Sequence, residues 1–335
     1  MMDPSCFAPR LAGMLPAVPT PFRCDQVDLD VFGAFCDRLV VRGSAGLVAC
    51  GTTGEATALT DTEYADVLDA AVRAANGRVP VVAGVPGTAT AAVIARALLA
   101  EAAGADALLL AAPPYVRPSQ PGLVAHVTAV HDATGLPIVL YDVPARTGVS
   151  FAVETIAALS DLPRVVGLKD ASGDLARPVR IRAEAGPAFV QLSGDDSTAA
   201  AHLAQGGGGC ISVTANVAPR ACAALVAAWQ RGDRYELARM RDVLDPLHAA
   251  LFVETNPVPL KAALAQLGLM PAEPRLPLAT ATRATQEVVS QALESVLPIE
   301  RALDGQPREA SSGAPPRGEP TLVFAPSRER VCCRS

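Results

Sequence analysis

Eight short apolar runs, separated by segments with helical periodicity, constrain the fold of this chain more than any other feature. Most of the runs are four to six residues long, rich in Val, Leu and Ile, and bounded by Gly or Pro. Such runs are typical of parallel strands that are buried on both faces. They lie at 15–20, 46–50, 80–83, 107–111, 137–141, 165–169, 189–192 and 210–213.

Helical patterns fill the gaps between these runs. Thr60 and Glu63 form a capping-box sequence at the start of one pattern, where each side chain satisfies a free backbone N–H. Two further patterns, at 88–103 and 120–133, are each followed within two residues by a glycine. Alternation of strands and helices implies βαβ units, and eight of them favour a closed barrel. We therefore predict an α/β fold, a (β/α)8 TIM barrel with a small C-terminal helical appendage.

The pattern changes after the eighth run. Four helical patterns follow without another strand, and from Pro298 on the chain becomes rich in Pro, Gly, Ser, Arg and Glu without any period. A composition of this kind is typical of disorder. We predict a catalytic barrel over 11–231, a helical region over 232–297 and a disordered tail over 298–335.

Composition excludes several classes of protein. The net charge of −6 argues against nucleic-acid binding, which requires a basic face. No stretch of ~20 apolar residues that would span a membrane occurs, and no secretory signal opens the chain. The eight cysteines form no C-x-x-C pair, and neither H-E-x-x-H nor G-x-S-x-G is present. We expect a cytoplasmic protein with reduced thiols and no metal site.

Lys169 ends the sixth run, at the end of a strand, where barrels of this type place their active sites. The chain contains two lysines, Lys169 and Lys261, beside 26 arginines, so only two side chains offer a primary amine. Burial disfavours the ammonium ion, and the neutral amine is the form that makes a Schiff base with a carbonyl substrate. Position alone leaves an alternative, in which Lys169 extends to the rim of the barrel or pairs with Asp170. Lys261, inside a predicted helix, is interpreted as a solvated or interface lysine.

Tyr141 ends the neighbouring fifth run. A phenol at that place can pass protons to and from a carbinolamine. A core tyrosine with a bonded hydroxyl is the alternative. Two adjacent strands that end in Tyr and Lys indicate a reactive site more strongly than either residue alone.

Two loops offer groups that bind anions. The glycines and consecutive N–H groups of Gly51-Thr-Thr-Gly-Glu55 can hold a small carboxylate, although a plain βα turn is the alternative. A phosphate loop is disfavoured because G-x-x-x-x-G-K-[ST] is absent. Arg146 can clamp a carboxylate with two hydrogen bonds, unless it is an ordinary surface arginine. Tyr115, on the loop after the fourth run, is by position alone a packing residue.

Seven ordered motifs resemble those of the dihydrodipicolinate synthase family, whose relatives include N-acetylneuraminate lyase. The resemblance extends from about residue 15 to about residue 297, and the Thr-Thr pair and Arg146 are closer to the synthase than to the lyase. The motifs are Gly51-Thr-Thr-Gly-Glu55, Pro118-Ser-Gln, Leu140-Tyr-Asp-Val-Pro-Ala-Arg-Thr-Gly148, Gly167-Leu-Lys-Asp-Ala-Ser-Gly173, Leu192-Ser-Gly-Asp-Asp196, Ile211-Ser-Val-Thr-Ala-Asn216 and Phe252-Val-Glu-Thr-Asn-Pro-Val-Pro-Leu-Lys261.

The resemblance implies a class I aldolase mechanism with pyruvate. Lys169 matches the Schiff-base lysine of the family, and Tyr141 matches its proton donor and acceptor. Thr52 and Tyr115 match the relay partners of that tyrosine. Since the second tyrosine crosses a dimer interface in the family, a homo-oligomer is implied, usually a tetramer built of dimers. No metal or organic cofactor is implied, because the imine itself serves as the electron sink.

The resemblance also implies how the substrates are held. Thr53, with the backbone of its neighbour, matches the group that binds the pyruvate carboxylate, and the backbone of Ile211 matches a position near pyruvate. Arg146 matches the arginine that binds the carboxylate of L-aspartate-4-semialdehyde. The implied product is 4-hydroxy-tetrahydrodipicolinate, on the path to diaminopimelate and lysine.

Some positions depart from the family pattern. Asp142 stands where the family usually has Asn, and Ala145 stands where Ser or Gly is common, and both lie beside the aldehyde subsite.

The pocket that binds inhibitory lysine in some members uses a Glu, an Asn, two His and a Tyr. The aligned residues here are Ala92, Thr88, Asp61 with Tyr64, and Pro114. We therefore expect weak or absent inhibition by lysine.

Two alternatives to the synthase remain open at this point. Another pyruvate-dependent aldolase or hydratase-aldolase would keep the lysine chemistry and change the acceptor. A non-catalytic barrel that binds a small molecule would need neither Lys169 nor the tyrosines.

Overall fold

Eight parallel strands form a closed barrel. The computed structural model describes residues 7–305, and its main sheet has the strand order β1-β10-β9-β8-β7-β6-β5-β4. A parallel bridge between Ala17 and Val48 joins the two outermost strands and closes the barrel. The strands are β1 (Gly13–Pro16), β4 (Leu47–Ala49), β5 (Val81–Gly84), β6 (Ala107–Ala111), β7 (Ile138–Asp142), β8 (Val165–Asp170), β9 (Val190–Ser193) and β10 (Gly209–Ser212).

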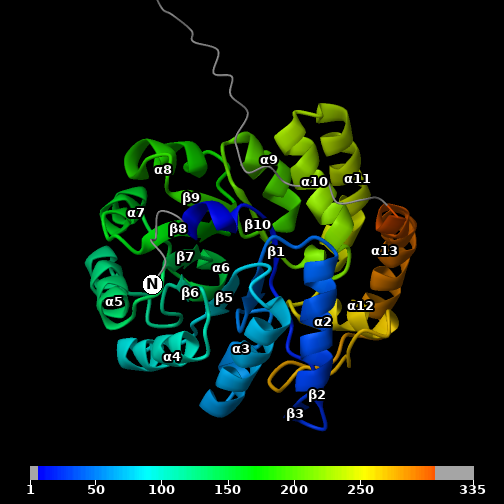
Figure 1. Cartoon of the computed structure of the whole chain (residues 1–335), viewed down its shortest axis with the longest axis horizontal. Helices are drawn as coiled ribbons and strands as arrows, with labels where there is room; N and C mark the ends of the chain where they lie inside the picture. Colours follow the sequence, from blue (N-terminus) through cyan, green and yellow to red (C-terminus); the bar gives the residue numbers. More distant parts are fainter. Residues whose placement is uncertain (1–6, 306–335) are drawn as a thin grey trace, which may run out of the picture.

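Helices surround this barrel, and the C-terminal helices lie to one side of it (Figure 1). Each of the eight predicted runs overlaps one strand, so the predicted (β/α)8 TIM barrel with a helical C-terminal segment is confirmed. The longer helices around the barrel are α2 (Leu29–Val41), α3 (Asp61–Ala75), α4 (Thr90–Ala102), α5 (Gln120–Ala133), α7 (Val153–Ser160), α8 (Arg177–Ala185), α9 (Ala199–Ala204) and α10 (Pro219–Arg231). The C-terminal helices are α11 (Arg234–Ala250), α12 (Val258–Gln266) and α13 (Arg283–Ala302).

A small hairpin was not predicted. Strands β2 (Phe22–Arg23) and β3 (Gln26–Val27) pair in antiparallel fashion outside the barrel. Two residues per strand are too few for an alternating pattern to be recognised in the sequence.

Side-chain alternation divides the core into two layers. In β7, Val139 and Tyr141 belong to the cluster inside the barrel, whereas Ile138 and Leu140 pack in the cluster between the sheet and the helices. Phe7 and Leu11, from the segment before β1, are buried in the inner cluster. The interior of the barrel is therefore a packed core.

The C-terminal helix extends beyond the predicted boundary. Helix α13 continues through Pro298 to Ala302, so the predicted disorder is wrong for residues 298–302. Glu300 explains this extension, because its buried carboxylate accepts hydrogen bonds from the backbone N–H groups of Arg220 (3.1 Å) and Ala221 (2.9 Å) at the start of α10. The remaining part of the predicted tail, 306–335, lies outside the described residues.

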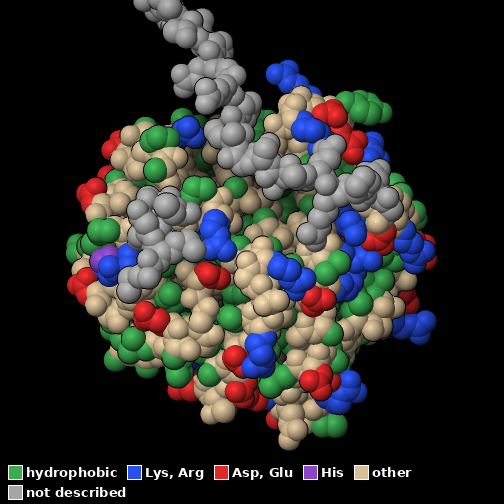
Figure 2. Space-filling view, in the orientation of Figure 1, with side chains coloured by type: hydrophobic (Ala, Val, Ile, Leu, Met, Phe, Trp, Pro, Cys, Tyr) green, Lys and Arg blue, Asp and Glu red, His purple; other side chains and the backbone are tan. Residues whose placement is uncertain are grey.

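Two further findings concern residues 7–305 only. None of the helices there is long and apolar enough to cross a membrane, and no group of three His, Cys, Asp or Glu side chains is placed to hold a metal ion. On the face drawn in Figure 2, acidic and basic side chains are interspersed and no extended basic patch is visible.

Candidate active site

A cavity of about 360 Å³ opens at the carboxyl ends of the strands. Five of the seven predicted site residues line it: Thr52, Thr53, Tyr141, Arg146 and Lys169. The strand ends and the C-terminal helices complete the wall with Ala17, Val48, Gly51, Leu109, Val143, Ala171, Gly194, Asp195, Ser197, Val213, Asp245, His248, Ala249, Phe252 and Asn256.

Lys169 and Tyr141 lie side by side in this cavity. They are register partners on the parallel strands β7 and β8, so their side chains point to the same face of the sheet. The Lys169 ammonium nitrogen lies 4.2 Å from the centroid of the Tyr141 ring. The exposed fractions of the two side chains are 7% and 8%. A nearly buried amine beside a phenol is an arrangement suited to imine formation, in which the phenol handles protons.

A one-residue irregularity in β8 sets this orientation. Val165 pairs with Ile138, but Gly167 pairs with Val139, so one extra residue is inserted into β8 at this point. A Cβ atom at Gly167 would come within 2.4 Å of the Val190 carbonyl oxygen on β9, which explains the glycine.

The loop from Gly51 to Glu55 forms a compact turn above β4. Within it, the N–H of Gly54 donates to the oxygen of Gly51 (3.1 Å) and the N–H of Glu55 donates to the oxygen of Thr52 (3.1 Å). The Thr20 hydroxyl donates to the oxygen of Gly54 (2.7 Å) and holds the turn from below. The turn presents Thr52 and Thr53 to the cavity, as a cradle for a small anion requires.

Asn256 links two of the predicted substrate groups. Its side-chain amide donates to the Thr53 hydroxyl (2.9 Å), and its backbone oxygen accepts from the Arg146 guanidinium (3.2 Å). Asn256 lies just before α12, so the C-terminal region takes part in building the cavity.

Tyr115 and Ile211 do not line the cavity of this chain. The exposed fraction of Tyr115 is 93%, and the residue lies on the loop after β6. The side chain of Ile211, on β10, is buried in the cluster inside the barrel. The backbone of Ile211 still lies one residue before the end of β10, near the end of the barrel where the cavity opens.

Sequence reasoning missed the far wall of the cavity. Asp195 and Ser197 follow β9, and Asp245 and His248 come from α11. The His248 Nδ1 atom lies 2.7 Å from the Thr214 hydroxyl oxygen, which fixes the ring against the turn that follows β10. The two α11 residues gave no signal, because a helix after the barrel follows no strand end.

Lys261 is not a solvated lysine, contrary to the interpretation from the sequence. Its side chain is completely buried and forms an ion pair with Glu55, the last residue of the Gly51–Glu55 turn. The Lys261 ammonium group also donates to the oxygen of Glu273 (3.0 Å) and lies 4.3 Å from the centroid of the Phe22 ring. Lys261 therefore supports the turn from outside the cavity and is absent from its wall.

Comparison with known proteins agrees with this arrangement. Residues 10–296 match the model of the dihydrodipicolinate synthetase family. The 4-hydroxy-tetrahydrodipicolinate synthase of Rhodospirillum centenum is 50% identical over 281 residues, which cover 84% of this chain and 97% of that protein.

Two solved structures extend the comparison to the fold. The 4-hydroxy-tetrahydrodipicolinate synthase of Methylacidiphilum fumariolicum is 34% identical, with a TM-score of 0.85 and coverage of 88% of this chain and 98% of that chain. The dihydrodipicolinate synthase of Acinetobacter baumannii, solved in complex with pyruvate, is 36% identical, with a TM-score of 0.83 and coverage of 85% and 99%. With a barrel of this topology and a lysine beside a tyrosine at its strand ends, the chain belongs to the dihydrodipicolinate synthetase family, enzymes of the lyase class that act through a Schiff base.

Proposed function

We propose that this chain is a 4-hydroxy-tetrahydrodipicolinate synthase, which condenses pyruvate with L-aspartate-4-semialdehyde. The observation that carries the proposal is the cavity that joins Lys169, Tyr141 and the Gly51–Glu55 turn to Arg146. The names of the relatives support the reaction, and the pyruvate complex of the Acinetobacter baumannii enzyme supports the first substrate.

The first half of the reaction takes place on Lys169. Its neutral amine attacks the ketone carbon of pyruvate, and loss of water gives an imine. Thr53 and the neighbouring backbone hold the pyruvate carboxylate, with Ile211 nearby. Tyr141, relayed through Thr52, transfers protons to and from the oxygen that leaves. Loss of a methyl proton then gives the enamine, and no metal or organic cofactor is needed for these steps.

The second half joins the acceptor. The enamine carbon attacks the aldehyde carbon of L-aspartate-4-semialdehyde, whose carboxylate is held by Arg146. The amino group of the acceptor then attacks the imine carbon, closes the ring and releases Lys169. The polar far wall with Asp195 and His248 leaves room for the polar groups of this acceptor.

In this proposal, the Tyr115 side chain of one copy of the chain completes the proton relay in the cavity of a second copy. Two observations support it: Tyr115 is exposed, and it does not line the cavity of its own chain. The proposed enzyme is a homo-oligomer, a tetramer built of dimers.

Borohydride reduction with pyruvate tests the chemistry. We expect a stable adduct on the peptide that contains Lys169, detected by mass spectrometry, and no adduct on the Lys261 peptide. A chain that gives no adduct on Lys169 under these conditions is a binding barrel and not this enzyme.

A panel of aldehydes tests the acceptor. We expect turnover with L-aspartate-4-semialdehyde and little turnover with sugar-derived aldehydes. Turnover with the sugar aldehydes alone would identify another pyruvate-dependent aldolase of the family. This alternative deserves the test because Asp142 and Ala145 depart from the family pattern close to Arg146.

We also propose that L-lysine inhibits this enzyme weakly or not at all. Ala92, on α4, offers no carboxylate for the ammonium group of a lysine ligand. Asp61 accepts a hydrogen bond from Arg96 (3.2 Å), and the Tyr64 hydroxyl donates to the oxygen of Gly84 (3.0 Å), so both polar groups already have partners in the chain. Initial rates measured against rising L-lysine check this, and half-maximal inhibition at sub-millimolar lysine would overturn it.

A further inference from the structure

The strand residues that follow Tyr141 and Lys169 are both aspartates. Because side chains alternate along a strand, Asp142 and Asp170 point away from the cavity, toward the helix layer. The two aspartates are register partners at the ends of β7 and β8, and both are buried. Two buried carboxylates at neighbouring positions require a cation, since neither is solvated by water.

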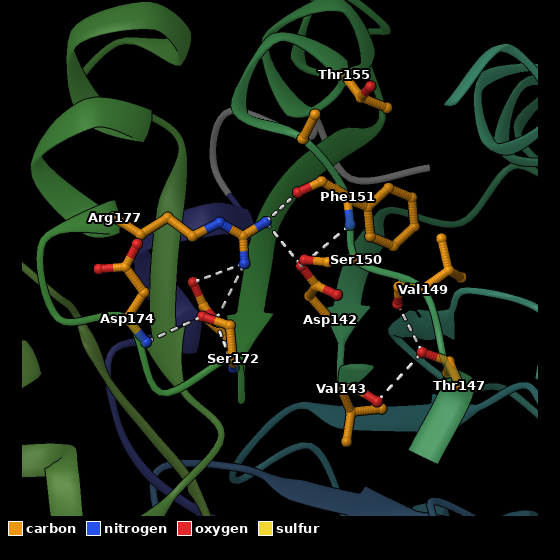
Figure 3. A network of polar contacts seen from close by, with 12 residues as sticks. Asp142, Val143, Thr147, Val149, Ser150, Phe151, Thr155, Ser172, Asp174 and Arg177 are labelled. Carbon is orange, nitrogen blue, oxygen red and sulfur yellow. Dashed lines mark hydrogen bonds and ion pairs between the residues drawn. The ribbon is translucent and has the colours of Figure 1, made fainter. Parts of the chain in front are cut away.

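Arg177, at the start of α8, supplies that cation. Its Nη2 atom lies 2.7 Å from Oδ2 of Asp142, and its Nη1 atom donates to both carboxylate oxygens of Asp170 (3.3 Å each). Nη2 also donates to the backbone oxygen of Phe151. Figure 3 shows the guanidinium reaching both the strand end and the segment that carries Phe151. Arg177 is itself buried, so these contacts are shielded from solvent.

Asp142 holds the same segment from the other side. Its Oδ2 atom accepts hydrogen bonds from the Ser150 hydroxyl (2.7 Å) and from the backbone N–H of Phe151 (3.2 Å) (Figure 3). Burial raises the pKa of Asp142, an effect that Ser150 and Arg177 oppose. The carboxylate of Asp142 thus bridges the start and the end of the loop at 143–151.

That loop carries Arg146. Its middle is closed by Thr147, whose hydroxyl donates to the oxygen of Val149 (2.7 Å) and lies 3.2 Å from the oxygen of Val143. Two further side chains anchor the loop. The neutral amide of Gln120 donates to the oxygen of Ser150 (2.8 Å), and the guanidinium of Arg117 donates to the oxygen of Gly148 (2.9 Å) in an exposed contact. The contact of Asp142 with Arg177 is the buried and charged anchor of the loop.

We propose that Arg177 is a positioning residue for the acceptor aldehyde, because with Asp142 it holds the loop at 143–151 in the form that directs Arg146 into the cavity. The inference rests on the proposed function, in which Arg146 binds the carboxylate of the acceptor. Tyr141 and Lys169 depend on Arg177 much less, since ladder hydrogen bonds to flanking strands fix β7 and β8 on both sides. Arg177 therefore governs the second substrate and not the formation of the pyruvate imine.

The test compares R177K and R177M with R180K. Arg180 lies one turn further along α8, is half-exposed and pairs with Asp174, so it is a matched control. For R177K we expect the KM of the aldehyde to rise roughly 10- to 100-fold, the size of effect that a small misplacement of a binding group produces. Borohydride trapping of pyruvate should stay close to wild type in R177K, and R180K should match wild type in both measurements. R177K retains a cation, so it keeps the test valid if R177M does not fold.

A double variant shows whether Arg177 acts through Arg146. In an R146A background, R177K should have no further effect on the KM of the aldehyde. The inference would be overturned if R177K lost borohydride trapping by as large a factor as its aldehyde KM rose. An unchanged aldehyde KM in R177K would also overturn it, and so would effects of R177K and R146A that add. The wild-type aldehyde panel judges the proposed function separately, and if it identifies another acceptor, the same variants are compared with that aldehyde.

Discussion

The two lysines of the chain are both buried but have different partners. Lys261 pairs with Glu55, whereas within residues 7–305 no acidic side chain forms an ion pair with Lys169. Asp170, the alternative partner considered for Lys169 from the sequence, binds Arg177 instead. A buried lysine without a carboxylate partner is free to use its amine on a carbonyl carbon, and a paired one is a structural cation.

Replacing Lys261 by Met is expected to destabilise the fold by about 3–5 kcal/mol, because Glu55 would be left buried without its cation. The double variant K261M/E55Q should recover a large part of this loss, since Gln carries no charge and can still accept from the N–H of Arg275. Urea unfolding measures both free energies. The exposed arginine of the Arg241–Asp242 pair is a control, and R241M should change stability by less than about 1 kcal/mol. A K261M loss no larger than that of R241M would contradict the structural role.

Strand ends explain why part of the site was predictable. Lys169, Tyr141 and the Gly51–Glu55 turn follow apolar runs directly, and a parallel barrel brings all its strand ends to one side. His248 and the burial of Lys261 depend on contacts with residues far away in the chain, so no local pattern indicates them. The sequence therefore indicated the side of the cavity that contains Lys169 and Tyr141, and not its far wall.

At the scale of elements, helix α3 combines a local signal with a distant contact. The predicted capping box is confirmed: the Thr60 hydroxyl accepts from the N–H of Glu63 (3.2 Å), and Glu63 accepts from the N–H of Thr60 (2.9 Å). Arg275, from the C-terminal region, adds two hydrogen bonds to the Glu63 carboxylate (2.5 and 2.8 Å). The bonds from Arg275 lower the pKa of Glu63 to about 2.

This shifted pKa predicts an acid-dependent contribution to stability. Because the pKa of Glu63 in the folded chain is below its ordinary value of 4.5, the ionised carboxylate stabilises the fold above that pH. The contribution is lost as the pH falls from 4.5 toward 2. The free energy of unfolding of E63Q should therefore be lower than that of wild type at neutral pH. This difference between the two proteins should shrink as the pH falls from 4.5 toward 2. Urea unfolding at a series of pH values measures it, with E287Q on the exposed surface of α13 as control. A difference that does not vary with pH would contradict the assignment.

The strands of the barrel were easier to predict from sequence patterns than the end of helix α13. The parallel strands of the barrel are mostly apolar, with polar residues gathered toward their carboxyl ends, so all eight were recognisable. The end of α13 was placed too early because Pro298 is normally a sign of a helix end, whereas here the buried Glu300 holds the following turn against α10.

At the scale of the whole molecule, the cavity of one chain lacks Tyr115, so the proposed proton relay is incomplete without a second copy. Tyr115 is almost fully exposed and has a backbone φ of +72°, a conformation that is rare for a bulky residue. Val116 beside it is also exposed. Strained residues persist where function or an interface constrains them. An exposed pair outside the cavity, with a strained backbone at Tyr115, fits a role in a neighbouring copy.

Mixing two inactive variants tests whether Tyr115 acts across an interface. K169A lacks the amine but retains Tyr115, and Y115F retains the amine but lacks the hydroxyl. If the tyrosine serves the partner's cavity, a mixed dimer contains one site with both groups, and random exchange of subunits restores about a quarter of the sites. If the tyrosine serves its own chain, no site in any mixed dimer is complete.

We expect the activity of the mixture, after subunits are dissociated and reassembled together, to exceed the sum of the activities of the separate variants. K169A mixed with the double variant K169A/Y115F is the control, because none of its sites has the amine. A mixture no more active than its components, with mixed dimers verified by native mass spectrometry, would show that the relay does not cross between subunits.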